Sequence, residues 1–251
     1  MGRVETNMSN QSKILVALDV DTVGKALALA GQLSGQVAGY KVGLELINSA
    51  GFGLLDKLRE TAGAEAKIFY DCKFLDIPNT VLGASKAVAK RGVWMFNIHA
   101  SGGSAMMKAA VSGAEIGAAE AGVPKPLVIA VSVLTSVSAE VLRDEMGVSR
   151  PLTEQVVALA RLAQDSGCDG LVASPHEIAA IRAACGPDFL LVIPGVRPIG
   201  AAIGDQKRVM TPGEAVKAGA DYIVVGRPIT ADIDPAASAR RINAETAGNT
   251  A

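Results

Sequence analysis

The sequence predicts an α/β protein, a single-domain (β/α)8 (TIM) barrel with short polar tails. Two observations predict this class. Short and nearly continuous apolar runs occur eight times along the chain, which is typical of parallel strands that are covered on both faces. Ala-rich segments with helical character separate these runs, and eight such units in about 225 residues fit a barrel close to the minimal size.

The eight predicted strands are, in chain order, ILVALD (14–19), GYKVG (39–43), AKIFYD (66–71), VWMFNIH (93–99), LVIAVSVL (127–134), GLVA (170–173), FLLVIP (189–194) and DYIVVG (221–226). A doubly wound open sheet is the alternative. Such a sheet usually has a Gly-rich turn after its first strand, whereas residues 19–22 here read Asp-Val-Asp-Thr.

Helical segments with clear start and stop signals lie between the strands. Examples are TVGKALALAGQL (22–33), TEQVVALARLAQDSG (153–167) and TPGEAVKAGA (211–220). Ser174 is expected to cap a helix in which Pro175 takes the first position and Glu177 completes a capping box. Gly167, Gly186 and Gly219 stand where helices are expected to end. We therefore expect one barrel domain over residues 13–236, a disordered tail over 1–12 and a second tail over 237–251.

The composition of the chain argues against several functional classes. Of 251 residues, 49% are hydrophobic and 20% are charged, with a formal net charge of −1. Broad binding to nucleic acid or to an anionic membrane would require a basic excess. The opening MGRVETNMSNQS lacks the apolar core of a secretory signal, and the three widely spaced cysteines favour reduced thiols. We expect a cytoplasmic protein.

Charged and polar residues gather where the predicted strands end, which is where barrel enzymes place their chemistry. The residues at these ends are Asp19, Lys41, Asp71, Lys73, His99, Thr135, Arg197, Gly226 and Arg227. Strand alternation directs Asp19, Asp71 and Lys73 into the mouth of the barrel and Cys72 to the opposite face. The stretch YDCKFLDIPNT (70–80) contains three charged residues, Asp71, Lys73 and Asp76. Burying an ion without a partner is costly, so a core strand alone would not explain them. We therefore expect a catalytic cluster there.

The last two strand ends suggest a phosphate site. The eighth strand ends in VVGRPIT, where backbone N–H groups at Gly226 can receive an anion beside Arg227. The seventh is followed by a long loop with Arg197 and Gln206, and loops of this length in compact barrels often act as lids. His99 is interpreted as an orienting histidine and His176 as a solvated one. The sequence contains no cluster of His, Cys and Glu at the spacing of metal ligands, so we predict no transition-metal site.

These residues resemble bacterial orotidine 5′-phosphate decarboxylases. The most specific motif is D-x-K-x-x-D-I-P-N-T at residues 71–80, with Cys72 at its first variable position. Further matching segments follow in the family's order: LVALD (15–19), YKVG (40–43), NIHASGG (97–103), SVLTS (132–136), PGVRP (194–198), DQKR (205–208) and YIVVGRPI (222–229). The resemblance covers residues 13–233.

The resemblance implies that Lys73 delivers a proton to C6 of the pyrimidine as carbon dioxide leaves orotidine 5′-phosphate to form UMP, with Asp71 and Asp76 as further catalytic residues. It implies that Asp19 and Lys41 hold the ribose and that Thr135 lies near the base. It further implies that the phosphate is bound by Arg197, Gln206, Gly226 and Arg227. It also implies a homodimer in which Asp76 and Thr80 enter the partner's site, with no cofactor or metal.

Two alternatives are also compatible with the sequence. Within the same superfamily, 3-keto-L-gulonate 6-phosphate decarboxylase and hexulose-phosphate synthase share the D-x-K-x-x-D core but use a magnesium ion. The I-P-N-T continuation and the loop with Gln206 favour the orotidylate interpretation. The other alternative is a non-catalytic barrel that binds a nucleotide phosphate, for which a broken D-x-K-x-x-D motif would be expected. Here the motif is intact.

Overall fold

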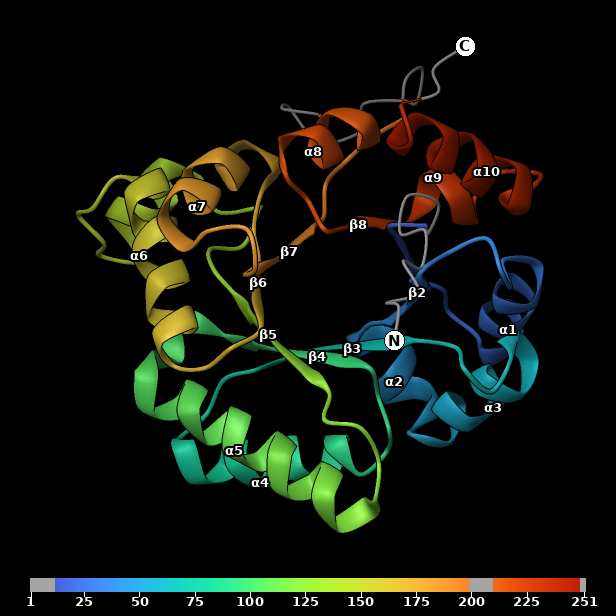
Figure 1. The fold of residues 1–251 in the computed structure, drawn as a ribbon, viewed down its shortest axis with the longest axis horizontal. Coiled ribbons are helices and arrows are strands. Elements are labelled where there is room, and N and C mark those ends of the chain that lie inside the picture. The colour runs from blue at the N-terminus through green and yellow to red at the C-terminus, as the bar shows by residue number, and fades with distance from the viewer. Residues whose placement is uncertain (1–11, 199–209, 249–251) are drawn as a thin grey trace, which may run out of the picture.

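The computed structural model describes residues 12–198 and 210–248. Eight parallel strands form a closed barrel in sequence order, with β8 paired to β1 (Figure 1). The strands are β1 (Ile14–Ala17), β2 (Gly39–Val42), β3 (Ile68–Phe74), β4 (Met95–His99), β5 (Leu127–Val131), β6 (Gly170–Val172), β7 (Leu190–Ile193) and β8 (Tyr222–Val225). The predicted fold class is confirmed.

Helices surround the barrel on the outside (Figure 1). They are α1 (Val23–Gln32), α2 (Leu44–Ala50), α3 (Gly53–Ala62), α4 (Pro78–Ala89), α5 (Gly103–Ala121), α6 (Leu152–Asp165), α7 (Ile178–Cys185), α8 (Pro212–Ala218), α9 (Arg227–Thr230) and α10 (Pro235–Thr246). Short helical turns add η2 (Ala100–Gly102), η3 (Val141–Glu145) and η4 (Pro175–Glu177). In the part of the chain described, no helix is long and apolar enough to cross a membrane.

The predicted helix boundary signals act as expected. Ser174 and Glu177 form a capping box, and its first turn, η4, leads into α7. Thr211 and Glu214 form a second box at the start of α8. Gly186 and Gly219 end α7 and α8 at positive φ, a backbone region in which glycine carries no steric penalty.

The core has two layers, as strand alternation requires. Inward-facing residues fill the barrel below its mouth: Leu15, Ala17, Phe69, Met95, Ile129, Val192 and Val224. The larger cluster lies between the strands and the surrounding helices and includes Val16, Tyr70, Phe96 and Leu171. The barrel interior is therefore a packed core rather than a pore.

The C-terminal segment differs from the predicted tail. Residues 235–246 form α10, in which Ser238, Ala239 and Ile242 are buried. Asp234 caps the helix by accepting a hydrogen bond from Ala237 N, and Asn243 donates one to Gln36 O at 2.7 Å. A few small apolar residues on one helix face are enough to dock a segment of polar composition. The other predicted tail, apart from Ser12, lies outside the described residues, as do 249–251.

Candidate active site

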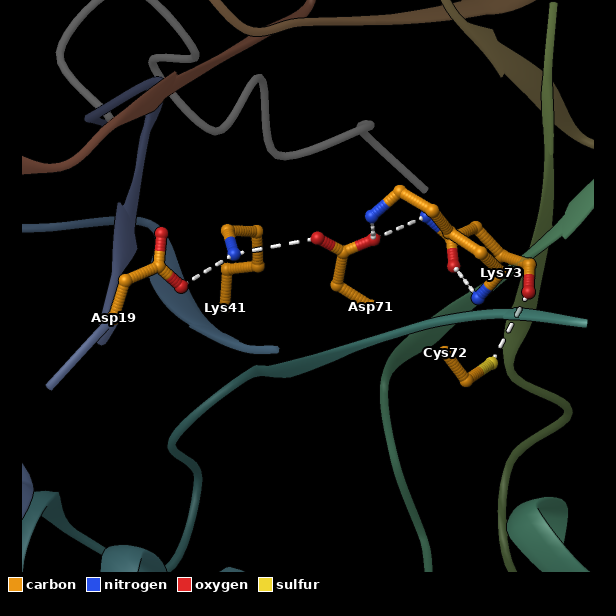
Figure 2. A network of polar contacts seen from close by, with 6 residues as sticks. Asp19, Lys41, Asp71, Cys72 and Lys73 are labelled. Carbon is orange, nitrogen blue, oxygen red and sulfur yellow. Dashed lines mark hydrogen bonds and ion pairs between the residues drawn. The ribbon is translucent and has the colours of Figure 1, made fainter. Parts of the chain in front are cut away.

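Four charged side chains alternate in sign across the mouth of the barrel (Figure 2). Lys41 Nζ on β2 lies 2.9 Å from Asp19 Oδ1 and 3.3 Å from Asp71 Oδ2. Lys73 Nζ lies 2.6 Å from the other oxygen of Asp71, Oδ1. The order Asp19–Lys41–Asp71–Lys73 therefore gives each inner charge a partner on both sides, as burial of ions requires.

Asp71 is a buried carboxylate, with 9% of the residue exposed. Burial by itself raises the pKa of Asp71, but the positive charges of Lys41 and Lys73 and hydrogen bonds from Lys73 and Asn97 outweigh it. The resulting pKa lies below the ordinary value for aspartate. Asp71 is consequently an anion at neutral pH, held between two cations.

The backbone at Lys73 is unusual. Strand β3 continues to Phe74, past the predicted end at Asp71, and its pairing with β4 shifts register between Tyr70 and Phe74. Lys73 has a φ of 49°, and it is the one non-glycine residue with positive φ in the described chain. Backbone strain of this kind is found preferentially at functional sites. Lys73 still faces the mouth, as alternation predicted.

Cys72 faces outward, as predicted, and belongs to the core between strands and helices. Its thiol donates to the Asn97 carbonyl oxygen at 3.1 Å, and burial raises the pKa of Cys72 to about 12. Cys168 and Cys185 are also free and buried. The Cys72 thiol is therefore an inert packing group rather than a nucleophile.

Asn97 on β4 is a site residue that the sequence analysis missed. It is 1% exposed, its Nδ2 donates to Asp71 Oδ1 at 2.7 Å, and its Oδ1 accepts from Lys73 N at 2.7 Å. Its signal was the presence of a polar residue inside the apolar run VWMFNIH. His99 ends the same strand half-buried, and burial followed by the charge of Lys73 lowers its pKa.

A cavity opens beside the charged cluster. Lys41, Asp71, Lys73 and Asn97 line its polar part. Its remaining lining consists of Phe69, Val131, Val133, Leu134, Thr135, Val172, Ala173, Val192, Pro194 and Val224. Apolar walls with a few convergent polar groups are typical of small-molecule sites. Thr135 thus lines the cavity, and its contact with a base stays a prediction.

Two arginines meet at the ends of β7 and β8. Arg197 follows β7, and its Nη1 donates to Val196 O at 2.9 Å. Burial, and then the positive charge of Arg227, lower the pKa of Arg197. Gly226 lies immediately before Arg227 at the start of α9. Like charges placed together favour binding of an anion between them. Gln206, the fourth predicted phosphate residue, lies outside the described residues.

Asp76 and Thr80 do not join the cavity of their own chain. Both are exposed, and Asp76 Oδ1 accepts a hydrogen bond from the adjacent Ile77 N at 2.6 Å. Among residues 12–198 and 210–248, no group of three or more His, Cys, Asp or Glu side chains is arranged to hold a metal ion.

Comparisons with known proteins identify the family of the chain. The model of the "Orotidine 5'-phosphate decarboxylase / HUMPS family" matches residues 12–242. A protein from Moorella thermoacetica named orotidine 5′-phosphate decarboxylase is 50% identical over 95% of this chain and 93% of its own length. One of the same name from Halorhodospira halophila is 51% identical over 94% and 96%.

Among solved structures, the orotidine 5′-phosphate decarboxylase of Lactobacillus acidophilus superposes with a TM-score of 0.82 at 40% identity. This match covers 94% of this chain and 98% of the other. The family match extends over nearly all of the barrel and includes every strand that contributes to the site. The chain therefore belongs to the orotidine 5′-phosphate decarboxylase / HUMPS family.

Proposed function

We propose that the protein decarboxylates orotidine 5′-phosphate to UMP, a step of de novo pyrimidine biosynthesis, and that Lys73 protonates C6. The observation that carries the proposal is the ion pair between Lys73 and the buried Asp71 at the edge of an apolar cavity. The close relatives of the same name support the substrate assignment.

The chemistry explains why a cation is needed at this position. When the C6–carboxylate bond breaks, its electron pair stays on C6 in the plane of the ring, where the ring π-system cannot delocalise it. A fixed ammonium group lowers the energy of this developing charge. Lys73 then transfers one of its protons to C6, which yields UMP and carbon dioxide, and the resulting amine regains a proton from solvent.

The other charges of the cluster hold this cation in place. Asp71 attracts Lys73 through one oxygen and Lys41 through the other. Little rearrangement is then required in the transition state, which is the principal advantage of a preorganised site. We assign Asp19 and Lys41 to the ribose and Thr135 to the base. Arg197, Gln206, Gly226 and Arg227 are assigned to the phosphate.

The proposal also includes a homodimer with shared sites. The segment after β3 exposes Leu75 by 56% and Ile77 by 68%, and large apolar side chains exposed this far often mark contacts between proteins. In this arrangement Asp76 and Thr80 complete the site of the partner subunit. We place the enzyme in the cytoplasm, where its three thiols remain reduced.

The direct test is to add orotidine 5′-phosphate to the purified protein and to follow its ultraviolet absorbance, with and without a chelator. Conversion that is insensitive to the chelator supports the proposal. A requirement for Mg²⁺, with turnover of a sugar phosphate instead, would identify the magnesium-dependent branch of the superfamily. Binding of UMP without any conversion would identify a non-catalytic barrel.

A further inference from the structure

Asn97 contacts three consecutive residues of β3. Its side-chain amide donates to Asp71 Oδ1 and accepts from Lys73 N, both at 2.7 Å. Its backbone carbonyl accepts from Cys72 Sγ at 3.1 Å. Asn97 is 1% exposed, so its two side-chain hydrogen bonds are made within the protein, and truncation to alanine would remove both of them.

The strand register explains why one residue has three partners. Tyr70 pairs with Phe96 and Phe74 pairs with Ile98, so β3 advances four residues while β4 advances two. Asn97 is the single residue of β4 opposite Asp71, Cys72 and Lys73. A bulge of this kind interrupts the ladder of backbone hydrogen bonds, and the Asn97 side chain supplies the acceptor that the Lys73 N–H group would otherwise lack.

The same amide orients the Asp71 carboxylate. Oδ1 of Asp71 receives Lys73 Nζ and Asn97 Nδ2, while Oδ2 faces Lys41. A carboxylate held by two hydrogen-bond donors on one oxygen and by a second cation at the other cannot rotate freely. Removing the amide would therefore loosen both the left-handed backbone of Lys73, where φ is 49°, and the anion that pairs with its ammonium group.

We infer that Asn97 is a positioning residue for the decarboxylation. It holds the backbone of Lys73 and the carboxylate of Asp71 in register, so that the ammonium group meets C6 without rearrangement. The inference rests on the proposed function, because it assumes that Lys73 is the proton donor. Asn97 itself makes no contact with the reacting atoms in this arrangement.

The first test is Asn97→Ala. Since a displacement of about 1 Å in a catalytic group can reduce turnover about 100-fold, kcat should fall by roughly that factor. The dissociation constant for UMP should change far less, because the groups assigned to ribose and phosphate remain. Asp221→Ala is the matched control, since Asp221 accepts from Leu191 N and Arg182 at the opposite end of the barrel. That variant should lose stability but keep its kcat.

Asn97→Asp gives a second test. The pH dependence of kcat expected for this variant would not arise if Asn97 had only a structural role. The new carboxyl group would face Asp71 and Lys73 on β3, with Lys41 on β2 and His99 on its own strand. When protonated it offers one donor and one acceptor, as the amide does, but when ionised it repels Asp71. A neighbouring carboxylate raises the pKa of such a group. The kcat of this variant should therefore rise toward acidic pH relative to wild type.

The outcomes separate the two proposals. If wild-type protein does not convert orotidine 5′-phosphate, the proposed function fails before Asn97 is tested. If wild type is active and folded Asn97→Ala keeps its full kcat, only the inference is wrong. If Asn97→Ala does not fold, the Asn97→Asp variant provides the test. A pH profile of its kcat that runs parallel to that of wild type overturns the inference. A large loss of UMP affinity in either variant would instead make Asn97 a substrate-binding residue.

Discussion

Lys73 Nζ lies 2.6 Å from Asp71 Oδ1, and the Asp71 side chain is only 12% exposed. An ion pair that is largely removed from water is screened less than a surface pair and acts more strongly on charges nearby. The pair therefore fixes a cation at the edge of the cavity.

Lys73→Ala should abolish decarboxylation and leave the fold and much of the UMP affinity intact. Lys73 acts mainly on charge that develops in the transition state, so its loss should lower kcat rather than ground-state binding. Turnover can be measured by absorbance and UMP binding by calorimetry. Lys86→Ala is the control, because Lys86 pairs with Glu120 on the outer helices at 2.6 Å. A Lys73→Ala enzyme that kept about a tenth of normal turnover would contradict this role.

Arg227→Ala should lower kcat/KM for orotidine 5′-phosphate by the equivalent of about 2–5 kcal/mol, because a charge-assisted contact with phosphate is lost. Orotidine, which lacks the phosphate, should react poorly with wild type and equally poorly with the variant. Steady-state kinetics with both compounds test this. The exposed Arg240 on α10 provides a control substitution. If Arg227→Ala slowed orotidine as much as the nucleotide, Arg227 would not be a phosphate ligand.

Part of this site follows from sequence patterns. Apolar runs such as ILVALD indicate strands because both faces of a barrel strand are covered. Alternation then directs Asp71 and Lys73 to one face. It also directs Asn97 to the mouth, since Met95 and His99 share its face, but a polar residue in an apolar run specifies no partner.

Other features depend on tertiary structure. The positive φ of Lys73 arises from the register between β3 and β4, and register between neighbouring strands is not a local property of either sequence. Helix α10 was expected as a tail because its composition is polar. Its docking depends on Ile242 and a few small residues, and the helix packs against α1, α8 and α9, which come together only in the folded chain.

The stability of the protein should depend on His99 in the acidic range. Burial and the charge of Lys73 lower the pKa of His99 below its ordinary value of 6.5. At a pH between the lowered pKa of folded His99 and 6.5, the unfolded chain binds a proton that the folded chain does not. The free energy of unfolding therefore falls as the pH drops below 6.5. His99→Gln should lose less stability than wild type between neutral and mildly acidic pH in urea unfolding. His176→Gln, at an exposed position, should behave as wild type, and equal pH dependence in all three proteins would contradict this assignment.

Helices α4 and α5 pack too closely for any side chain at Gly117. A Cβ atom there would lie 2.2 Å from Lys86 O. Gly117→Ala should force the helices apart and cost about 1–3 kcal/mol of stability, as overpacking does, with kcat little changed in the folded enzyme. Gly24→Ala is the matched control, because its added Cβ meets no atom within 4 Å beyond its chain neighbours and the nearby backbone of its own helix, and it should gain about 0.4–1 kcal/mol. Thermal unfolding distinguishes the two, and an unaltered Gly117→Ala melting temperature would contradict the packing argument.

The homodimer with shared sites is the remaining prediction. Asp71 and Lys73 line the cavity of their own chain, but Asp76 lies beyond β3 in an exposed segment with Leu75 and Ile77. Pro78 at the start of α4 restricts the residue before it to extended conformations, which carries Asp76 away from its own cavity. In a two-fold dimer the contribution is reciprocal, each subunit lending Asp76 and Thr80 to the other.

Complementation between two inactive variants tests this arrangement. Lys73→Ala and Asp76→Ala homodimers should each be inactive. After they are unfolded together and refolded, random pairing makes about half of the dimers mixed. In a mixed dimer one site carries both substitutions and the other carries neither, so about a quarter of wild-type activity should return. Each variant refolded alone is the control. If mixed dimers form, as native mass spectrometry can show, and no activity returns, Asp76 acts in the site of its own subunit.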